Sequence, residues 1–318
     1  MLYTKKTEKG IISVREASDM TKILSIKGQY DFPPLSLAIG LFDGLHLGHQ
    51  MLFKETLTDE GESSVLTFTN DLKNKTKNDQ NGPLLTEKEK EEMLSSFHIK
   101  NEFILPFDEE TKNTTKEEFI AFLLSLNVRK IVVGEDFTFG KFSQGKAKDL
   151  LSLMDKGVKV EILPLFEING EKVSSTRIRA LLNDHQIKEA NELLGYDFFY
   201  QGRVIHGKEN GRKISFPTAN IDLENKKFRL PNGVYKTRTI LNGTSYPSMT
   251  NIGNHPTIDP LKSAIIETHI FLLDDDLYGN DIMVEFLSFI REQKKFSSLL
   301  ELKEQLNKDK EKCLEKQD

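Results

Sequence analysis

The chain has 318 residues, of which 37% are hydrophobic and 29% charged, and this length suits two domains with a core each. Its formal net charge of −5 argues against a general nucleic-acid binder and favours small-molecule substrates. No apolar run is long enough to span a bilayer, so we expect no membrane partner. The single cysteine, Cys313, cannot form an internal disulfide, which predicts a cytoplasmic protein.

The first half of the chain alternates short apolar segments with helical ones. Strands are predicted at residues 11–14, 35–39, 65–68, 103–106, 131–133 and 158–163. Thr86 with Glu89, and Thr115 with Glu118, have capping-box spacing, which predicts a helix start at each. The alternation is typical of a parallel sheet with crossover helices, whose ligands bind beyond the carboxyl ends of the strands.

The strand predicted at residues 35–39 runs into a glycine-bearing turn, and helical spacing of apolar residues resumes at Met51. This layout suits phosphate, because the unpaired N–H groups and the dipole of a helix N-terminus favour an anion. His46 and His49 lie in the turn and can donate to phosphate oxygens. A solvated helix start or a metal-binding pair remains the alternative on these residues alone.

Two later loops at the same edge of the predicted sheet also have unusual compositions. After Val133, glycines alternate with phenylalanines, including Phe137 and Phe139, which suit either a ligand contact or the core. After the last strand, hydroxyl residues precede arginines at residues 174–179. That pattern fits a second phosphate contact or a plain helix cap with surface arginines.

From Tyr200 onward the pattern changes to short β-rich segments separated by glycine and proline. They lie at residues 202–205, 233–241, 248–252, 265–273 and 282–289, and predict a closed antiparallel barrel or a sandwich. An amphipathic helix at residues 296–314 is expected to pack on it. We therefore predict two domains, residues 1–188 and 189–318.

Two stretches of the second domain carry chemical groups. A basic glycine-bearing loop at residues 207–213 precedes Thr218 and Asn220, whose neutral oxygens suit a hard cation such as Mg²⁺. A surface hairpin followed by a turn is the alternative. Glu267 lies in a β-branched segment, where a carboxylate faces solvent or acts as a base toward a hydroxyl that attacks phosphorus.

Several motifs in a fixed order make the chain resemble the bacterial bifunctional riboflavin kinase/FAD synthetase family over nearly its full length. The first-domain motifs lie at residues 40–49, 133–140 and 174–179. Those of the second domain lie at residues 211–212, 216–220, 231–235, 251–253, 267 and 276–279. The resemblance implies an α/β Rossmann-like nucleotidylyltransferase domain, followed by an antiparallel β-barrel riboflavin kinase module with a C-terminal helix.

The resemblance also implies two ATP-dependent reactions with Mg²⁺: riboflavin to FMN in the second domain, and FMN to FAD with release of pyrophosphate in the first. By this likeness the catalytic residues are His46, His49, Arg177 and Glu267, and the Mg²⁺ ligands are Thr218 and Asn220. Flavin contacts are Phe137, Phe139 and Asn251. Nucleotide or phosphate contacts are Gly40, Phe42, Asp43, Gly44, Gly48, Asp136, Ser174, Ser175, Thr176, Gly207, Gly211 and Arg212.

Three positions depart from the family pattern. Residues 68–72 lack a Pro-His-Pro segment, Ser215 replaces a glycine, and residues 254–256 replace Thr-Arg-Pro with Asn-His-Pro. Two alternatives therefore stay open: a FAD synthetase whose barrel only binds flavin, and a flavin- or nucleotide-sensing protein without turnover. The sequence also leaves open whether the chain forms a homo-oligomer.

Overall fold

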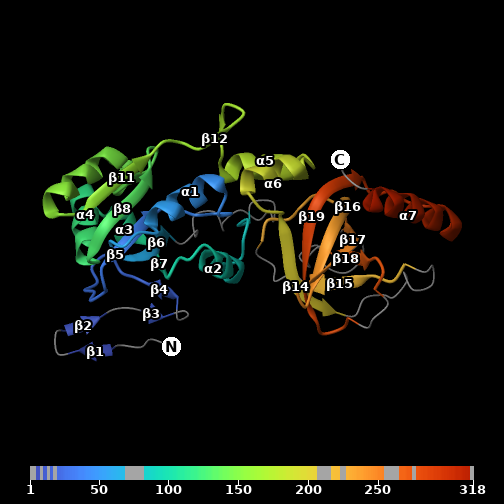
Figure 1. The fold of residues 1–318 in the computed structure, drawn as a ribbon, viewed down its shortest axis with the longest axis horizontal. Helices are drawn as coiled ribbons and strands as arrows, with labels where there is room; N and C mark the ends of the chain where they lie inside the picture. The colour runs from blue at the N-terminus through green and yellow to red at the C-terminus, as the bar shows by residue number, and fades with distance from the viewer. Residues whose placement is uncertain are drawn as a thin grey trace. The chain divides into compact units, whose positions relative to one another are not determined.

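The computed structural model describes residues 5–7, 10–12, 15–16, 20–68, 82–205, 216–222, 227–253, 265–273 and 277–315 (Figure 1). By their internal contacts the residues divide into two compact units, Met1–Ser175 and Thr176–Asp318. The first unit is an α/β domain and the second contains a β-barrel. The predicted fold class is therefore confirmed.

The first unit is built on a seven-stranded sheet with the strand order β11-β8-β5-β6-β7-β4-β3. All neighbouring pairs from β11 to β4 are parallel, and only the edge strand β3 is antiparallel to its neighbour. The strands are β3 (Arg15–Glu16), β4 (Thr21–Ile23), β5 (Leu35–Ile39), β6 (Glu62–Phe68), β7 (Asn101–Leu105), β8 (Val128–Gly134) and β11 (Lys159–Leu163).

The helices of this unit connect the parallel strands. Both predicted capping boxes are present, Thr86 with Glu89 and Thr115 with Glu118. The helices are α1 (Leu47–Thr56), α2 (Glu87–Ser96), α3 (Glu109–Asn113) and α4 (Lys116–Ser125), with the 3-10 helices η2 (Lys141–Ser143) and η3 (Ala147–Lys156). Short hairpins are formed by β1 (Lys5–Thr7) with β2 (Gly10–Ile12), β9 (Thr138–Phe139) with β10 (Gly145–Lys146), and β12 (Glu167–Ile168) with β13 (Glu171–Lys172).

Three local predictions were wrong or incomplete. The strand expected at residues 11–14 is β2, which pairs with β1 in a separate hairpin. Helix α1 begins at Leu47 and not near Met51, so His49 lies in its first turn. Strand β4 and the helix η3 were not predicted, although buried apolar residues recur at every third position of η3, at Ala147, Leu150 and Leu153.

The strand order places a switch point between β5 and β8. Strand β5 is completely buried, and the chain leaves it toward β6 and β7 on one side, then returns to β8 and β11 on the other. Loops that follow β5 and β8 therefore diverge at the carboxyl edge of the sheet, and ligands of open α/β sheets bind at such a place. This is the edge that carries the predicted phosphate loops.

The second unit contains a closed barrel in the order β14-β15-β18-β17-β16-β19, in which all described pairs are antiparallel. Its strands are β14 (Phe199–Ile205), β15 (Ala219–Asp222), β16 (Gly233–Leu241), β17 (Thr244–Gly253), β18 (Ile265–Ile270) and β19 (Asp281–Arg291). The helices α5 (Ser175–Asn183) and α6 (Ile187–Leu194) precede it, and α7 (Leu299–Leu314) follows. Closure removes exposed sheet edges, and the barrel prediction is confirmed.

Helix α7 is held on the barrel by one buried ion pair. Asp309 is completely buried and accepts from the guanidinium of Arg291, with the shortest contact, from Nη2, at 2.7 Å. We expect Asp309→Ala to lower the free energy of unfolding by about 3 kcal/mol, because it leaves a largely buried cation without its partner. Urea denaturation checks this, with the exposed acid Glu304→Ala on the same helix as control. Equal stability of the two variants would contradict the role of the pair.

Candidate active sites

The turn after β5 is held in a strained conformation. Phe42 and Leu45 adopt φ angles of 46° and 41°, although bulky residues rarely enter the left-handed region. Gly44 has a φ of 80°, and a side chain there would clash with Leu84. Asp43 Oδ1 accepts from the backbone N–H of Leu84 at 2.9 Å, which fixes the turn from one side. Such strain persists only where surrounding contacts impose it, and it gathers at functional sites.

The two histidines of this turn form a stacked pair. His46 occupies the N-cap position of α1, and its ring lies 3.6 Å from the His49 ring, centroid to centroid, at an interplanar angle of 19°. Phe42 is buried beneath them and meets His49 edge-on. Both Nδ1 atoms are buried without a hydrogen-bond partner among the described residues. No protein contact fixes these nitrogens, so a bound ligand can set the tautomer of each ring.

Burial keeps both rings neutral near pH 7. Burial lowers the pKa of His46 to about 4, although the negative charge of Asp43 offsets part of this effect. Burial also lowers the pKa of His49 well below its ordinary value. A neutral pair can stack without charge repulsion, and each ring still donates one N–H to a phosphate oxygen. The site therefore offers donors whose strength does not depend on protonation around neutral pH.

These pKa values predict a loss of stability in acid. Between pH 6.5 and about 4 the unfolded chain binds a proton at His46 and the folded chain does not, so the free energy of unfolding falls as the pH falls. Over this whole pH range, the shifted pKa of His46 lowers the free energy of unfolding by about 3 kcal/mol. Urea denaturation between pH 7 and 4.5 should show a shallower fall for His46→Asn, since asparagine also caps helices well. If the free energy of unfolding fell equally with pH in the wild type and in His46→Asn, His46 would not be buried and neutral in the folded protein.

The loops after β8 and β11 meet beside this turn. Glu135 accepts from the backbone N–H of Leu165 through Oε1 at 3.1 Å, which joins the two loops. Ser175 Oγ donates to the carbonyl oxygen of Asp43 at 2.8 Å. Asp136 forms an ion pair with Lys172. Residues of all three predicted phosphate loops, around positions 43, 136 and 175, are thus linked within the first unit.

The aromatic residues of the second loop differ in burial. Phe139 is only 5% exposed and packs against Phe119 and Phe137 in the core, whereas Phe137 is partly buried. Packing accounts for Phe139, so its contact with flavin stays a prediction. Ser174 precedes α5, and Thr176 and Arg177 follow in its first turn. Their contacts with phosphate also stay predictions.

The barrel register brings three predicted residues of the second site side by side. Asn220 on β15 and Asn251 on β17 both lie directly opposite Glu267 on β18, one from each side. Residues paired in this way share one face of a sheet. Asn220 is 9% exposed and Glu267 half-buried, while the neighbouring Thr268 points into the barrel, where it is completely buried. Glu267 therefore lies on the outer face, flanked by two amides.

The Mg²⁺ site expected at Thr218 and Asn220 stays a prediction. Asn220 lies on β15 and Thr218 directly precedes that strand, and their hydroxyl and amide oxygens are of the neutral hard kind that suits the ion. Within the described residues, no group of three or more His, Cys, Asp or Glu side chains is arranged to hold a metal. Gly207, Gly211, Arg212, Ser215 and residues 254–256 lie outside the described residues, as does the segment at residues 69–72.

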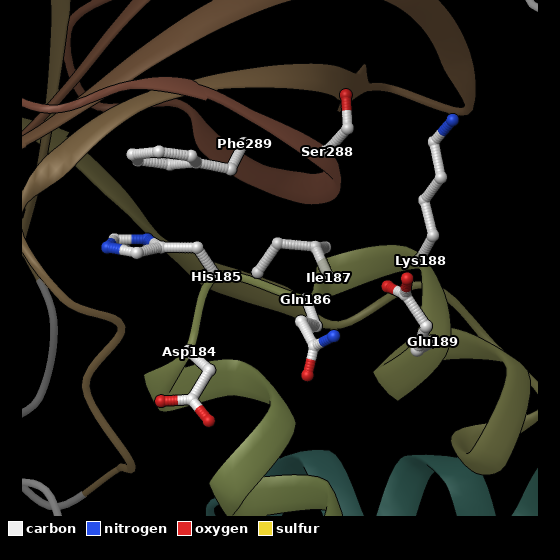
Figure 2. Close-up of a pocket in the computed structure, with 8 residues that line it drawn as sticks. All are labelled: Asp184, His185, Gln186, Ile187, Lys188, Glu189, Ser288 and Phe289. Atoms are coloured by element: carbon white, nitrogen blue, oxygen red, sulfur yellow. The ribbon is translucent and has the colours of Figure 1, made fainter.

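One pocket of about 380 Å³ lies elsewhere in the second unit (Figure 2). It is lined by the turn between α5 and α6 and by Ser288 and Phe289 of β19. His185 stacks on Phe289 with ring centroids 3.8 Å apart, and its Nδ1 lies 3.1 Å from the Tyr235 hydroxyl. None of the predicted site residues lines this pocket, and the stacked rings serve to dock the turn on the barrel.

The sequence reasoning missed the hairpin β12–β13, which carries Lys172. Asn169 and Gly170 form its two-residue turn, with φ angles of 58° and 75°. An Asn-Gly pair between short extended segments is a strong hairpin signal and was available in the sequence.

These features define a class: a protein with a Rossmann-like α/β unit and a second unit that contains a closed antiparallel β-barrel. Two family models match the chain, FAD synthetase over residues 29–177 and riboflavin kinase over residues 194–316. The boundary predicted between residues 188 and 189 falls in the stretch between these matches. No helix among the described residues has the length and apolar character needed to cross a membrane.

The relatives cover both domains. The bifunctional riboflavin kinase/FMN adenylyltransferase of Bacillus subtilis is 33% identical over 87% of this chain and 91% of its own length. The Escherichia coli K12 protein of the same name is 34% identical over 86% and 90%. A crystal structure described as a macrolide-efflux protein from Streptococcus pneumoniae matches with a TM-score of 0.84 and 32% identity, over 94% of this chain and all of that one. The chain belongs to the bifunctional riboflavin kinase/FMN adenylyltransferase family, with one domain for each family activity.

Proposed function

We propose that the barrel phosphorylates riboflavin with ATP to give FMN, and that the α/β domain joins FMN to the AMP part of a second ATP, releasing pyrophosphate. The observation that best supports the second step is the stacked pair His46–His49 at the switch point of the sheet. The first step is supported by the alignment of Glu267 with Asn220 and Asn251 across three strands.

In the α/β domain the transfer requires position and charge neutralisation more than covalent chemistry. The N-terminus of α1 and the neutral rings of His46 and His49 donate to the phosphates as charge develops at the α-phosphorus. The phosphate oxygen of FMN attacks that phosphorus, and pyrophosphate leaves. Ser174, Thr176 and Arg177 provide further donors in this proposal, and the strained turn keeps the histidines in place before substrate arrives.

In the barrel, Glu267 accepts the proton of the riboflavin hydroxyl that attacks the γ-phosphorus of ATP, and ADP leaves as the bond from that phosphorus to the bridging oxygen breaks. Asn220 and Asn251 lie opposite Glu267 on the two neighbouring strands. Thr218 and Asn220 would hold Mg²⁺, which would supply positive charge that neutralises the phosphates of ATP. Both reactions draw on ATP, and the proposal places the enzyme in the cytoplasm, in accord with its single, buried cysteine.

Product analysis tests the proposal against its two alternatives. The protein is incubated with MgATP and riboflavin, and separately with MgATP and FMN, and the flavins are separated by chromatography. We expect FMN and FAD from riboflavin, and FAD from FMN. If FAD forms only in the tube that contains FMN, the barrel binds flavin without phosphorylating it. If flavin binds in both tubes and no product forms in either, the protein is a sensor.

A further inference from the structure

Strand β18 carries a buried histidine that has no role in the reactions as described so far. His269 follows Glu267 by two positions, so the two side chains lie on the same face of the strand, while Thr268 between them points into the barrel. The side chain of His269 faces outward and yet is only 8% exposed. Part of its cover comes from the segment that leads into the neighbouring strand β15 (Figure 1).

The backbone pairing of β15 with β18 ends directly before this segment. Ala219 and Thr268 form the pair at the start of β15. Thr218 precedes them, and Pro217 before it has no N–H with which to continue a ladder. The carbonyl oxygen of Pro217 lies 2.7 Å from Nδ1 of His269. The histidine side chain therefore binds the incoming segment at the point where the strands cease to hold it.

The chemistry of this contact fixes the tautomer of the ring. A carbonyl oxygen only accepts hydrogen bonds, so Nδ1 of His269 carries the proton and donates it to Pro217. Burial lowers the pKa of His269, although the hydrogen bond to Pro217 offsets part of this effect. The ring is therefore neutral near pH 7, and its one N–H is committed to the Pro217 carbonyl.

Two aromatic side chains set the direction of the ring. Phe216, which is 6% exposed, comes from the segment before β15, and its ring centroid lies 5.0 Å from that of His269. Phe271 directly follows β18 and meets the histidine edge-on, with the centroids 5.3 Å apart. Because packing already restricts the ring, little side-chain entropy is lost when its N–H binds the carbonyl.

We propose that His269 is a positioning residue of the phosphorylation site, which anchors the Pro217 carbonyl and so sets where Thr218 and Asn220 lie relative to Glu267. The carbonyl of Pro217 and the N–H of Thr218 belong to one planar peptide group, so fixing the first orients the second. The inference rests on the proposed function of the barrel. It adds to that function a residue that acts through the backbone and not on a substrate.

Kinetics of riboflavin phosphorylation test the inference. His269→Leu and His269→Asn are a matched pair, because the two side chains have nearly the same shape and only asparagine carries an N–H next to Cγ. His269→Leu should raise the KM for MgATP by about 10-fold, the loss expected for one hydrogen bond, and leave kcat within about threefold. His269→Asn should stay within about threefold of the wild type in both. His269→Phe, a second variant without a donor, should match His269→Leu.

Hydrogen exchange of the substrate-free protein gives a readout that does not depend on turnover. The backbone amides of residues 218–220 should exchange about 10-fold faster in His269→Leu than in the wild type or His269→Asn, because the segment opens more easily without its anchor. Phe271→Leu is the matched control, since it loosens the packing around the ring but keeps the N–H. It should lower the free energy of unfolding in urea and leave the KM and this exchange within about twofold.

The possible results separate the inference from the function on which it rests. An unchanged KM or unchanged exchange in both donor-free variants would overturn the role of His269, as would equal losses in His269→Asn or Phe271→Leu. A wild type that forms no FMN from riboflavin would overturn the proposed function of the barrel, and the inference with it. If Glu267→Gln abolishes phosphorylation while His269→Leu and His269→Phe behave as the wild type, only the role of His269 is wrong.

Discussion

His49→Ala is expected to slow FAD formation from FMN by about 100- to 1,000-fold, the cost of removing one donor to a developing transition-state charge. His49 lies in the first turn of α1, stacked on His46 and supported by Phe42 from beneath, so its ring is already positioned when substrate binds. Because burial keeps the ring neutral, the loss should be similar from pH 6.5 to 8. Single-turnover rates with FMN and MgATP measure it.

The second reaction provides an internal control for this variant. Riboflavin phosphorylation, which we assign to the barrel, should change by less than about twofold in His49→Ala, because the substitution alters no residue of the barrel. The matched control is His98→Asn, which alters an exposed histidine of the same unit at a φ of 61° that asparagine tolerates. A parallel fall of both activities in a folded His49→Ala protein would contradict the assignment of two sites.

Glu267→Gln is expected to slow riboflavin phosphorylation by about 100-fold or more, the usual contribution of a positioned general base. Glutamine keeps the size and the hydrogen bonding of the side chain but cannot accept the hydroxyl proton. Because glutamine has nearly the same shape as glutamate, binding of riboflavin is expected to change little. FMN production measured at saturating riboflavin and MgATP gives the rate.

A surface carboxylate of the same barrel gives the comparison for Glu267. Asp281 on β19 is 66% exposed and pairs with Arg203, and Asp281→Asn should leave phosphorylation unchanged. FAD formation from supplied FMN should continue in Glu267→Gln at the wild-type rate. Normal phosphorylation by Glu267→Gln would assign the base to another residue and leave Glu267 as an ordinary strand charge.

The fold could be predicted from the sequence where one physical signal dominates. Strand β5 is apolar at every position but Ser36 because both of its faces are covered, and its predicted and observed bounds coincide. The capping boxes at Thr86 and Thr115 are local and were predicted correctly. Strand β4 was missed because it is short and the rest of the sheet stabilises it. The buried face of η3 repeats at every third residue, which differs from the spacing of an α-helix.

The candidate sites show the same division. Residues inside a contiguous motif, such as His46 and His49, could be proposed from the sequence because spacing alone relates them. The alignment of Asn220, Glu267 and Asn251 depends on strand register across a closed barrel, which short-range patterns do not specify. The ion pair of Lys172 with Asp136 was missed since the two residues are 36 positions apart, and only the folded chain brings them together.

Mixing the two variants tests the central claim most directly. With riboflavin and MgATP, His49→Ala alone should accumulate FMN, and Glu267→Gln alone should leave riboflavin nearly unchanged. Together they should produce FAD, because FMN released by the first variant is adenylylated by the second. Two results would contradict an enzyme with two separate sites that act one after the other. The first is FAD formation by either variant alone at the wild-type rate. The second is no FAD from the mixture, although Glu267→Gln still converts supplied FMN.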